Sequence, residues 1–158
     1  RVPVKYRTFY DVILDGAIRP THAVEIINCW NQSKLEKTDG DVWRYDANIE
    51  RTQKHTWVLM LTNETLTAIN EMGEDKPTEL GYLRLQQTRK LLRPKFVQKV
   101  AYNAMRKNGI DRDVAEFLSG RRPEGVGARH YAELISLAEQ QYPKYAKYLE
   151  ELRRKALN

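Results

Sequence analysis

The sequence predicts a mainly α-helical single domain with one small antiparallel β-sheet or hairpin. Apolar residues recur every three to four positions along most of the chain, which is the period of one helix face. Only two short segments, Val42–Ala47 and Thr56–Leu61, have the β-branched and aromatic character of strands. The composition, 41% hydrophobic and 30% charged over 158 residues, is that of a globular domain with a buried core.

Three helices are predicted to accompany these strands in the first half of the chain. Their expected bounds are Val4–Asp15 with Gly16 as terminator, Pro20–Gln32 with proline at its start, and a helix to Met72 with Asn63 as N-cap. The side chains expected in the core are Tyr6, Phe9, Val12, Ile13, Val24, Ile27 and Trp30. The polar segment Ser33–Asp41 is predicted to be a loop, and Asn48–His55 the end of a hairpin.

The chain after the turn at residues 73–77 is predicted to be helical throughout. A basic helix opens at Pro77-Thr78, and Pro94 interrupts it. The helices expected after it are Lys95–Lys107 ending at Gly109, a short helix capped by Asp111 and ending at Leu118, and two amphipathic segments, Ala128–Gln141 and Pro143–Ala156. Arg121–Gly127 is predicted to be a loop.

The cysteine and histidine content bounds the chemistry. Cys29 is the only cysteine, which excludes an internal disulfide and fits a reducing compartment. Because Cys29 stands beside Trp30 in an apolar helical pattern, we expect it in the core. The histidines are not spaced as metal ligands, so we expect no metal site and no cofactor. No apolar run approaches the roughly 20 residues of a membrane span, and the first ten residues are unlike a signal peptide.

The net charge of +6 originates in one segment of the chain. Between Glu79 and Asp111 there are eight basic residues and no acidic residue, which leaves 19 of the 27 basic residues elsewhere against all 21 acidic ones. The eight are Arg84, Arg89, Lys90, Arg93, Lys95, Lys99, Arg106 and Lys107. Such a segment favours a polyanion, most simply nucleic acid, and the alternative is a solvated basic helix face.

Four features whose residue types suit phosphate binding or catalysis follow one another along the chain. Arg19 precedes a helix start, where guanidinium and free backbone N–H groups together suit a phosphate. Lys54 stands at the hairpin end, Lys95 in the basic region, and Tyr131 after a glycine-rich segment, where a tyrosine can be a nucleophile. Each has a plain alternative when taken alone, namely a surface ion pair, a solvated turn lysine or a core tyrosine.

Taken in order, these features resemble the catalytic domain of the tyrosine recombinase family, and within it the integrases of archaeal fuselloviruses and related archaeal plasmids. The segments that carry the resemblance are Phe117-Leu118-Ser119-Gly120-Arg121-Arg122-Pro123, His130-Tyr131 and Glu139-Gln140-Gln141-Tyr142-Pro143-Lys144-Tyr145-Ala146. The resemblance implies the recombinase catalytic-domain fold over residues 1–158, with the family's N-terminal DNA-clamping domain absent from this chain. It also implies site-specific DNA integration and excision inside the host cell, on DNA, in the cytoplasm.

The resemblance further implies a role for each site residue. Tyr131 would attack the scissile phosphate and form a 3′-phosphotyrosyl bond, with Lys54 protonating the leaving 5′-oxygen. Arg19, Lys95 and Arg121 would complete the catalytic set, and Gln98 stands where the family has a second arginine. Because glutamine carries no charge, either Gln98 is a weakening substitution or Arg93 compensates for it. The energy of the broken bond is kept in the phosphotyrosyl link, so neither ATP nor an obligatory metal is implied.

The resemblance also implies the partners of the chain. They are a double-stranded DNA attachment site, contacted by Arg84, Arg89, Lys90, Arg93, Lys99, Arg122 and Arg129, and further copies of the chain in a tetrameric synapse on DNA, with no membrane. Two other functions stay open, a non-catalytic DNA-binding module and a type IB topoisomerase that relaxes supercoils. The apolar positions of the tail from Pro143 to Ala156 would pack on their own domain or dock on a neighbouring copy.

Overall fold

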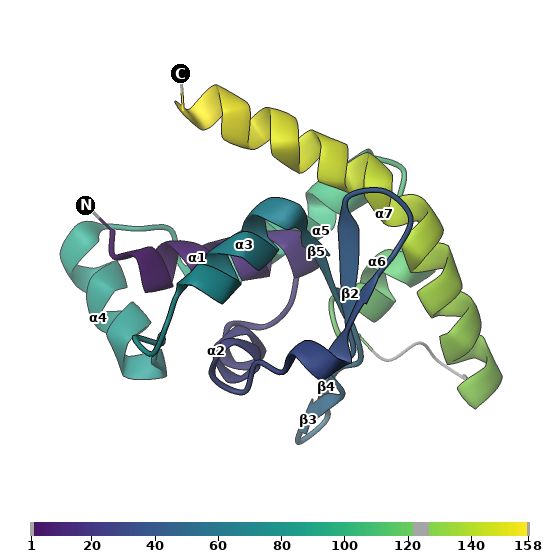
Figure 1. The fold of residues 1–158 in the computed structure, drawn as a ribbon, viewed down its shortest axis with the longest axis horizontal. Helices are drawn as coiled ribbons and strands as arrows, with labels where there is room; N and C mark the ends of the chain where they lie inside the picture. The colour runs from purple at the N-terminus through teal and green to yellow at the C-terminus, as the bar shows by residue number, and fades with distance from the viewer. Residues whose placement is uncertain (1, 122–126, 158) are drawn as a thin grey trace.

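The computed structural model describes residues 2–121 and 127–157, and it is mostly helical with two small antiparallel sheets (Figure 1). The predicted fold class is therefore confirmed. The helices are α1 (Val4–Gly16), α2 (Pro20–Asn28), α3 (Asn63–Glu71), α4 (Glu79–Arg89), α5 (Pro94–Lys107), α6 (Arg112–Leu118) and α7 (Ala128–Leu157), with a 3₁₀ turn, η1 (Gln32–Lys34). The strands are β1 (Leu35–Lys37), β2 (Val42–Tyr45), β3 (Ile49–Arg51), β4 (Lys54–Thr56) and β5 (Leu59–Thr62).

The three-stranded sheet β1-β2-β5 separates two hydrophobic clusters. Leu59 and Leu61 of β5 belong to the cluster with α1, α2 and α3, whereas Met60 belongs to the cluster with α6 and α7. Because successive strand residues point to opposite faces, β5 is buried on both sides. Figure 1 shows β2 and β5 between these helix groups, and α5 contributes side chains to both clusters.

The strands differ from the prediction in three respects. The second predicted strand is divided, because Thr56 ends β4 and β5 begins only at Leu59. The expected hairpin end forms a sheet of its own, β3-β4, after Asn48 takes a positive φ of 46° and its N–H donates to the Trp57 carbonyl. The expected loop also contains β1, an exposed three-residue edge strand that pairs with β2. Such short edge strands have little apolar pattern to reveal them.

Helix ends account for further differences. The α1 face was predicted correctly, since Tyr6, Phe9, Val12 and Ile13 are all buried. Helix α2 ends at Asn28, four residues earlier than predicted, and Cys29 is its exposed C-cap, so the expected core position is wrong. Trp30 still packs, stacked on Tyr45 at 4.4 Å between ring centroids.

The cap residues agree only in part with the prediction. The N-cap of α3 is Thr62, whose hydroxyl accepts from the Thr65 N–H, so the predicted cap Asn63 is the first helical residue. Thr78 caps α4 as expected, accepting from the Gly81 N–H. Asp111 is the N-cap of α6 by position, but its carboxylate accepts from the Gln141 side chain.

The last two predicted segments are one continuous helix, α7, that runs through Pro143. A proline inside a helix removes one hydrogen bond and costs about 3 kcal/mol or more. Here one apolar face continues across it and is fully buried, through Leu134, Ala138, Tyr142, Tyr145 and Leu149. Burial of that face offsets the proline. The apolar face of the tail therefore packs on its own domain as far as Leu149, and Leu152 beyond it is 39% exposed.

Helix α4 lies at the edge of the domain, beside α1 (Figure 1), and contributes no buried residue. Its Tyr82 ring stacks on Phe9 at 4.9 Å, and Tyr10 donates to the Leu92 carbonyl just after the helix. Glu79 of α4 also pairs with Arg51 at 3.4 Å, and the basic side chains Arg84 and Arg89 remain exposed. Among the described residues, no helix is long and apolar enough to cross a membrane.

Candidate functional site

Arg19 is fixed at the junction of two helices. Helix α1 ends where Ala17 adopts a left-handed conformation, with φ of 52°, and its N–H bonds the Ile13 carbonyl. Ala17 and Ile18 are fully buried, and Arg19 is the N-cap of α2 with Pro20 at the first helical position. The backbone that carries Arg19 is thus enclosed by the core.

The surroundings of the Arg19 guanidinium favour binding of an anion. The Arg19 Nε atom is buried, and no hydrogen-bond partner for it occurs among the described residues. Burial lowers the pKa of Arg19, and the positive charge of Arg121 lowers it further. Two guanidinium groups that repel each other without a carboxylate between them gain stability when an anion binds.

Arg121 is positioned by the end of α6. The Gly120 N–H donates to the Phe117 carbonyl and the Arg121 N–H to the Glu116 carbonyl, which is the Schellman pattern of a helix end. Gly120 has a φ of 77°, and a Cβ there would lie 2.2 Å from the His55 carbonyl oxygen, so only glycine fits. The Arg121 guanidinium lies over the Tyr102 ring, 4.7 Å from its centroid.

Arg19, Arg121 and helix α5 surround one cavity, which we call the arginine cavity. Arg93 is the N-cap of α5, and Lys95, Gln98, Lys99 and Tyr102 follow at helical spacing. The cavity has a volume of about 620 Å³ and is lined by Arg19, Arg93, Lys95, Phe96, Gln98, Lys99, Tyr102, Ser119 and Arg121. Five cations and no carboxylate therefore line it within the described part of the chain.

Tyr131 lies in the first turn of α7, in a neighbouring tyrosine cavity of about 670 Å³. Its half-buried ring is 5.1 Å from the Trp57 ring and 6.0 Å from the Phe117 ring. Trp57 in turn stacks on His55 at 4.3 Å. Aromatic packing, rather than a hydrogen bond recorded among the described residues, holds the tyrosine.

The two cavities meet at the turn after α6. Ser119 and Arg121 line the arginine cavity, and Gly120 between them lines the tyrosine cavity. The structure thus brings Arg19, Lys95, Gln98 and Arg121 together and puts Tyr131 on the adjoining side of one turn.

Lys54 is exposed at the start of β4, and its neighbours Gln53 and His55 line the tyrosine cavity. Two contacts hold this hairpin to α2. The Arg51 Nε pairs with a Glu25 oxygen at 2.8 Å, and His22 Nδ1 lies 2.6 Å from the Thr56 hydroxyl.

His22 is uncharged at neutral pH. Burial lowers its pKa to about 4, with nearby Arg19, Arg51 and His55 acting in the same direction and Glu25 opposing them. The neutral His22 ring shares a hydrogen bond with the Thr56 hydroxyl. Because His22 follows Arg19 by three residues in α2 and Thr56 ends the strand that begins at Lys54, this bond joins the two elements that carry Arg19 and Lys54.

The residues predicted to contact DNA are spread over several elements. Those that the structure describes are all exposed: Arg84, Arg89, Lys90, Arg93, Lys99 and Arg129. Arg122, and most of the predicted loop Arg121–Gly127, lies outside the described residues. No cluster of three or more metal-ligating side chains occurs in the described part of the chain.

Sequence reasoning missed two residues that line the cavities, Trp57 and Tyr102, and a third, His22, that fastens the hairpin beside them. Trp57 and Tyr102 support Tyr131 and Arg121, and His22 bonds the hairpin. Trp57 has the character of a strand core residue, and Tyr102 follows Lys95 and Gln98 on one helix face. That spacing was the one available signal for Tyr102.

A mainly helical domain with five cations around one cavity has the character of a protein that binds phosphate-bearing polymers such as nucleic acids. A family model described as archaeal phage integrase matches residues 3–148. The match spans nearly the whole chain, so the protein belongs to the archaeal phage integrase family. This confirms the integrase resemblance, and membership supports DNA binding and DNA integration by recombination. A search of curated proteins found no match.

Proposed function

We propose that this chain cuts and rejoins DNA at specific sites through a covalent bond to Tyr131. The Tyr131 oxygen attacks the scissile phosphorus, a P–O bond to the tyrosine forms, and the bond to the 5′-oxygen breaks. The phenol proton goes to solvent, and Lys54 protonates the leaving 5′-oxygen. The reverse attack by a 5′-hydroxyl rejoins the strand, so the number of phosphoester bonds is conserved without ATP.

The observation that carries this proposal is the pair of adjoining cavities. Phosphoryl transfer requires stabilisation of charge on the non-bridging oxygens, which arginine forks supply. Arg19 and Arg121 share the arginine cavity with Lys95, and Tyr131 borders the next one across Gly120. Family membership supports the same assignment.

We assign the remaining parts of the reaction to the rest of the molecule. The exposed basic residues of α4 and α5 hold the DNA backbone, and copies of the chain assemble as a tetramer on two attachment sites. The chain acts as the catalytic domain, with a separate clamping domain completing the grip on DNA. Because phosphate contacts release counterions, affinity should fall steeply as salt rises.

Covalent capture from a randomised pool tests the proposal and selects the target sequence in one experiment. The chain is incubated with nicked duplexes whose central segment is randomised, because loss of the short fragment beside the nick traps the cleaved state. We expect a protein–DNA adduct that survives denaturant, with captured sequences converging on one motif. The control, Tyr131→Phe, should bind the same DNA within about twofold and form no adduct. An equal yield from Tyr131→Phe would overturn the proposal, as would binding by the native chain without any adduct.

Gln98 favours one second candidate, DNA binding without cleavage. It is half-buried in the arginine cavity and offers a neutral amide where a charged donor would serve better. Under this alternative neither the native chain nor Gln98→Arg forms an adduct, although both bind DNA. An adduct from the native chain excludes it, whereas an adduct from Gln98→Arg alone would mean that Tyr131 is competent and that Gln98 prevents cleavage by this chain.

A further inference from the structure

Two buried tyrosines of α7 close the end of α1. The Tyr142 hydroxyl donates to the Asp15 carbonyl at 2.8 Å, and the Tyr145 hydroxyl donates to the Leu14 carbonyl at 2.7 Å. Carbonyls in the last turn of a helix have no partner within it, so these hydroxyls take the place of water. Both side chains are fully buried, and burial raises the pKa of each hydroxyl, which keeps it a proton donor.

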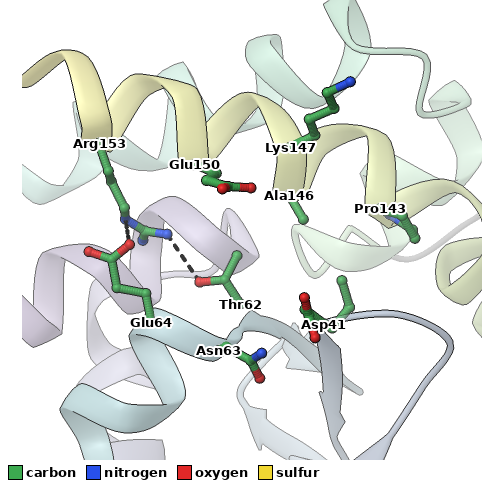
Figure 2. Close-up of a pocket in the computed structure, with 10 residues that line it drawn as sticks. Asp41, Thr62, Asn63, Glu64, Pro143, Ala146, Lys147, Glu150 and Arg153 are labelled. Carbon is green, nitrogen blue, oxygen red and sulfur yellow. Dashed lines mark hydrogen bonds and ion pairs between the residues drawn. The ribbon is translucent and has the colours of Figure 1, made fainter.

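The Asp15 side chain makes a second connection between the end of α1 and α7. Its carboxylate accepts from the Thr62 N–H at 2.8 Å and from Arg153 of α7 at 2.8 Å, and it is fully buried. Figure 2 shows Arg153 reaching down from α7 toward Thr62 and Glu64 at the start of α3. Asp15 is therefore tied to α7 through both its backbone and its carboxylate.

The chain between this attachment and Arg19 has little freedom. A Cβ at Gly16 would lie 2.2 Å from the Leu59 side chain, and Ala17 and Ile18 are fully buried. The Arg19 Nε, by contrast, has no hydrogen-bond partner among the described residues. The backbone from Leu14 to Ile18 consequently fixes the Cα position from which the Arg19 side chain extends, and no hydrogen bond of its Nε among the described residues adds a second constraint.

We propose that Tyr142 and Tyr145 are positioning residues for Arg19, and that their two hydroxyl bonds to the end of α1 aim its guanidinium at the scissile phosphate. The inference rests on the proposed function, because it needs Arg19 to contact that phosphate. It adds a task for α7 that is separate from carrying Tyr131.

The test is a double-mutant cycle on the rate of adduct formation in a single turnover, at saturating protein and on the duplex captured above. Tyr142→Phe with Tyr145→Phe removes two oxygen atoms and keeps both rings. We expect this pair to slow adduct formation by roughly 10- to 100-fold, since a displacement of about 1 Å costs that much. In an Arg19→Ala background the same pair should change the rate by less than about twofold.

Tyr148→Phe is the matched control. Tyr148 stacks on Tyr145 at 5.9 Å and is half-buried on the same helix, and no bond of its hydroxyl is recorded within the described residues. This variant should cleave at the native rate. An equal loss from the tyrosine pair with and without Arg19, or no loss in either, overturns the inference.

A second readout does not depend on turnover or on both tyrosines being replaceable. In Tyr131→Phe protein, which does not cleave, we compare affinity for duplex DNA and for the same duplex with a neutral methylphosphonate at the cleavage position. Tyr142→Phe alone should reduce the preference for the phosphate severalfold, and Tyr148→Phe should leave it unchanged. An unchanged preference in Tyr142→Phe contradicts the inference. If the native chain forms no adduct with any duplex, the proposed function itself fails; if Arg19→Ala slows cleavage but the tyrosine variants do not, the inference alone fails.

Discussion

The two halves of the site are held in different ways. The arginine cavity is built on buried backbone, with Asp15 to Ile18 enclosed by the core and Gly120 fixed by a helix-end motif. Tyr131 is held by ring packing in the first turn of α7, beside a small exposed hairpin. A hydrogen bond requires an aligned donor and acceptor, whereas aromatic rings pack in both stacked and edge-to-face arrangements. The half with Arg19 and Arg121, which we propose binds the phosphate, is thus preorganised, and the half with Tyr131, the proposed nucleophile, has fewer directional constraints.

Of the substitutions that test this difference, Arg19→Ala should have the largest effect on the rate of adduct formation. Loss of one charged donor from a preorganised phosphate site typically lowers a rate by about 10²–10³-fold. We expect that loss in single-turnover adduct formation, with DNA affinity within about threefold of native, because the basic residues of α4 and α5 remain. A comparable result from Lys147→Ala, an exposed cation on the far part of α7, would contradict a specific role for Arg19.

Gln98→Arg tests whether the arginine cavity lacks one positive charge that would speed cleavage. A hydrogen bond to a charged group contributes about 1.5–3 kcal/mol, so a guanidinium there should speed adduct formation by roughly 10- to 100-fold. If Arg93 already supplies that charge, Gln98→Arg will change little and Arg93→Ala will cause a large loss. Adduct rates of the two variants, measured side by side, distinguish these outcomes.

Trp57→Leu tests the ring packing that holds Tyr131, the proposed nucleophile. An aromatic pair contributes about 0.5–1.5 kcal/mol beyond its burial, so we expect adduct formation to slow by up to about tenfold. Trp57→Phe, which keeps an aromatic ring, should lie closer to the native rate. A loss as large as that of Arg19→Ala would contradict the difference between the two halves.

His22 should produce the smallest effect, one on stability. Its pKa is lowered from 6.5 to about 4 in the folded chain, so between these values the unfolded chain binds more protons. Stability contributed by the neutral ring is therefore present above pH 6.5 and is lost as pH falls toward 4. His22→Gln, which cannot titrate, should show a flatter decline of melting temperature over this window. Parallel curves for the two proteins would contradict a buried neutral His22.

The sequence predicted elements that depend on local pattern and missed those that depend on distant contacts. The buried α1 face and the end of the short helix at Leu118 follow from the helical period and from the local sequence around Gly120, and both are confirmed. Cys29 was misplaced because α2 ends early, where the Asn28 side chain bonds the carbonyls of Val24 and Pro77. Strand β1 was missed because its pairing with β2, not its own residues, makes it a strand.

The continuity of α7 shows the same limit. Pro143 is a local signal for a break, but burial of Tyr142 and Tyr145 on either side outweighs it. For the site, the order of Arg19, Arg121 and Tyr131 was evident from motifs. The contact of Trp57 with Tyr131 joins residues far apart in the chain, and spacing along the sequence carries no information about it.

The most direct test of the account is to identify the residue that carries DNA in the captured adduct. The adduct is digested with nuclease and protease, and the peptide bearing a residual nucleotide is sequenced by mass spectrometry. We expect a 3′-linked nucleotide on Tyr131, in a peptide from the start of α7. A nucleotide on any other residue, or linkage through a 5′-phosphate, would contradict it.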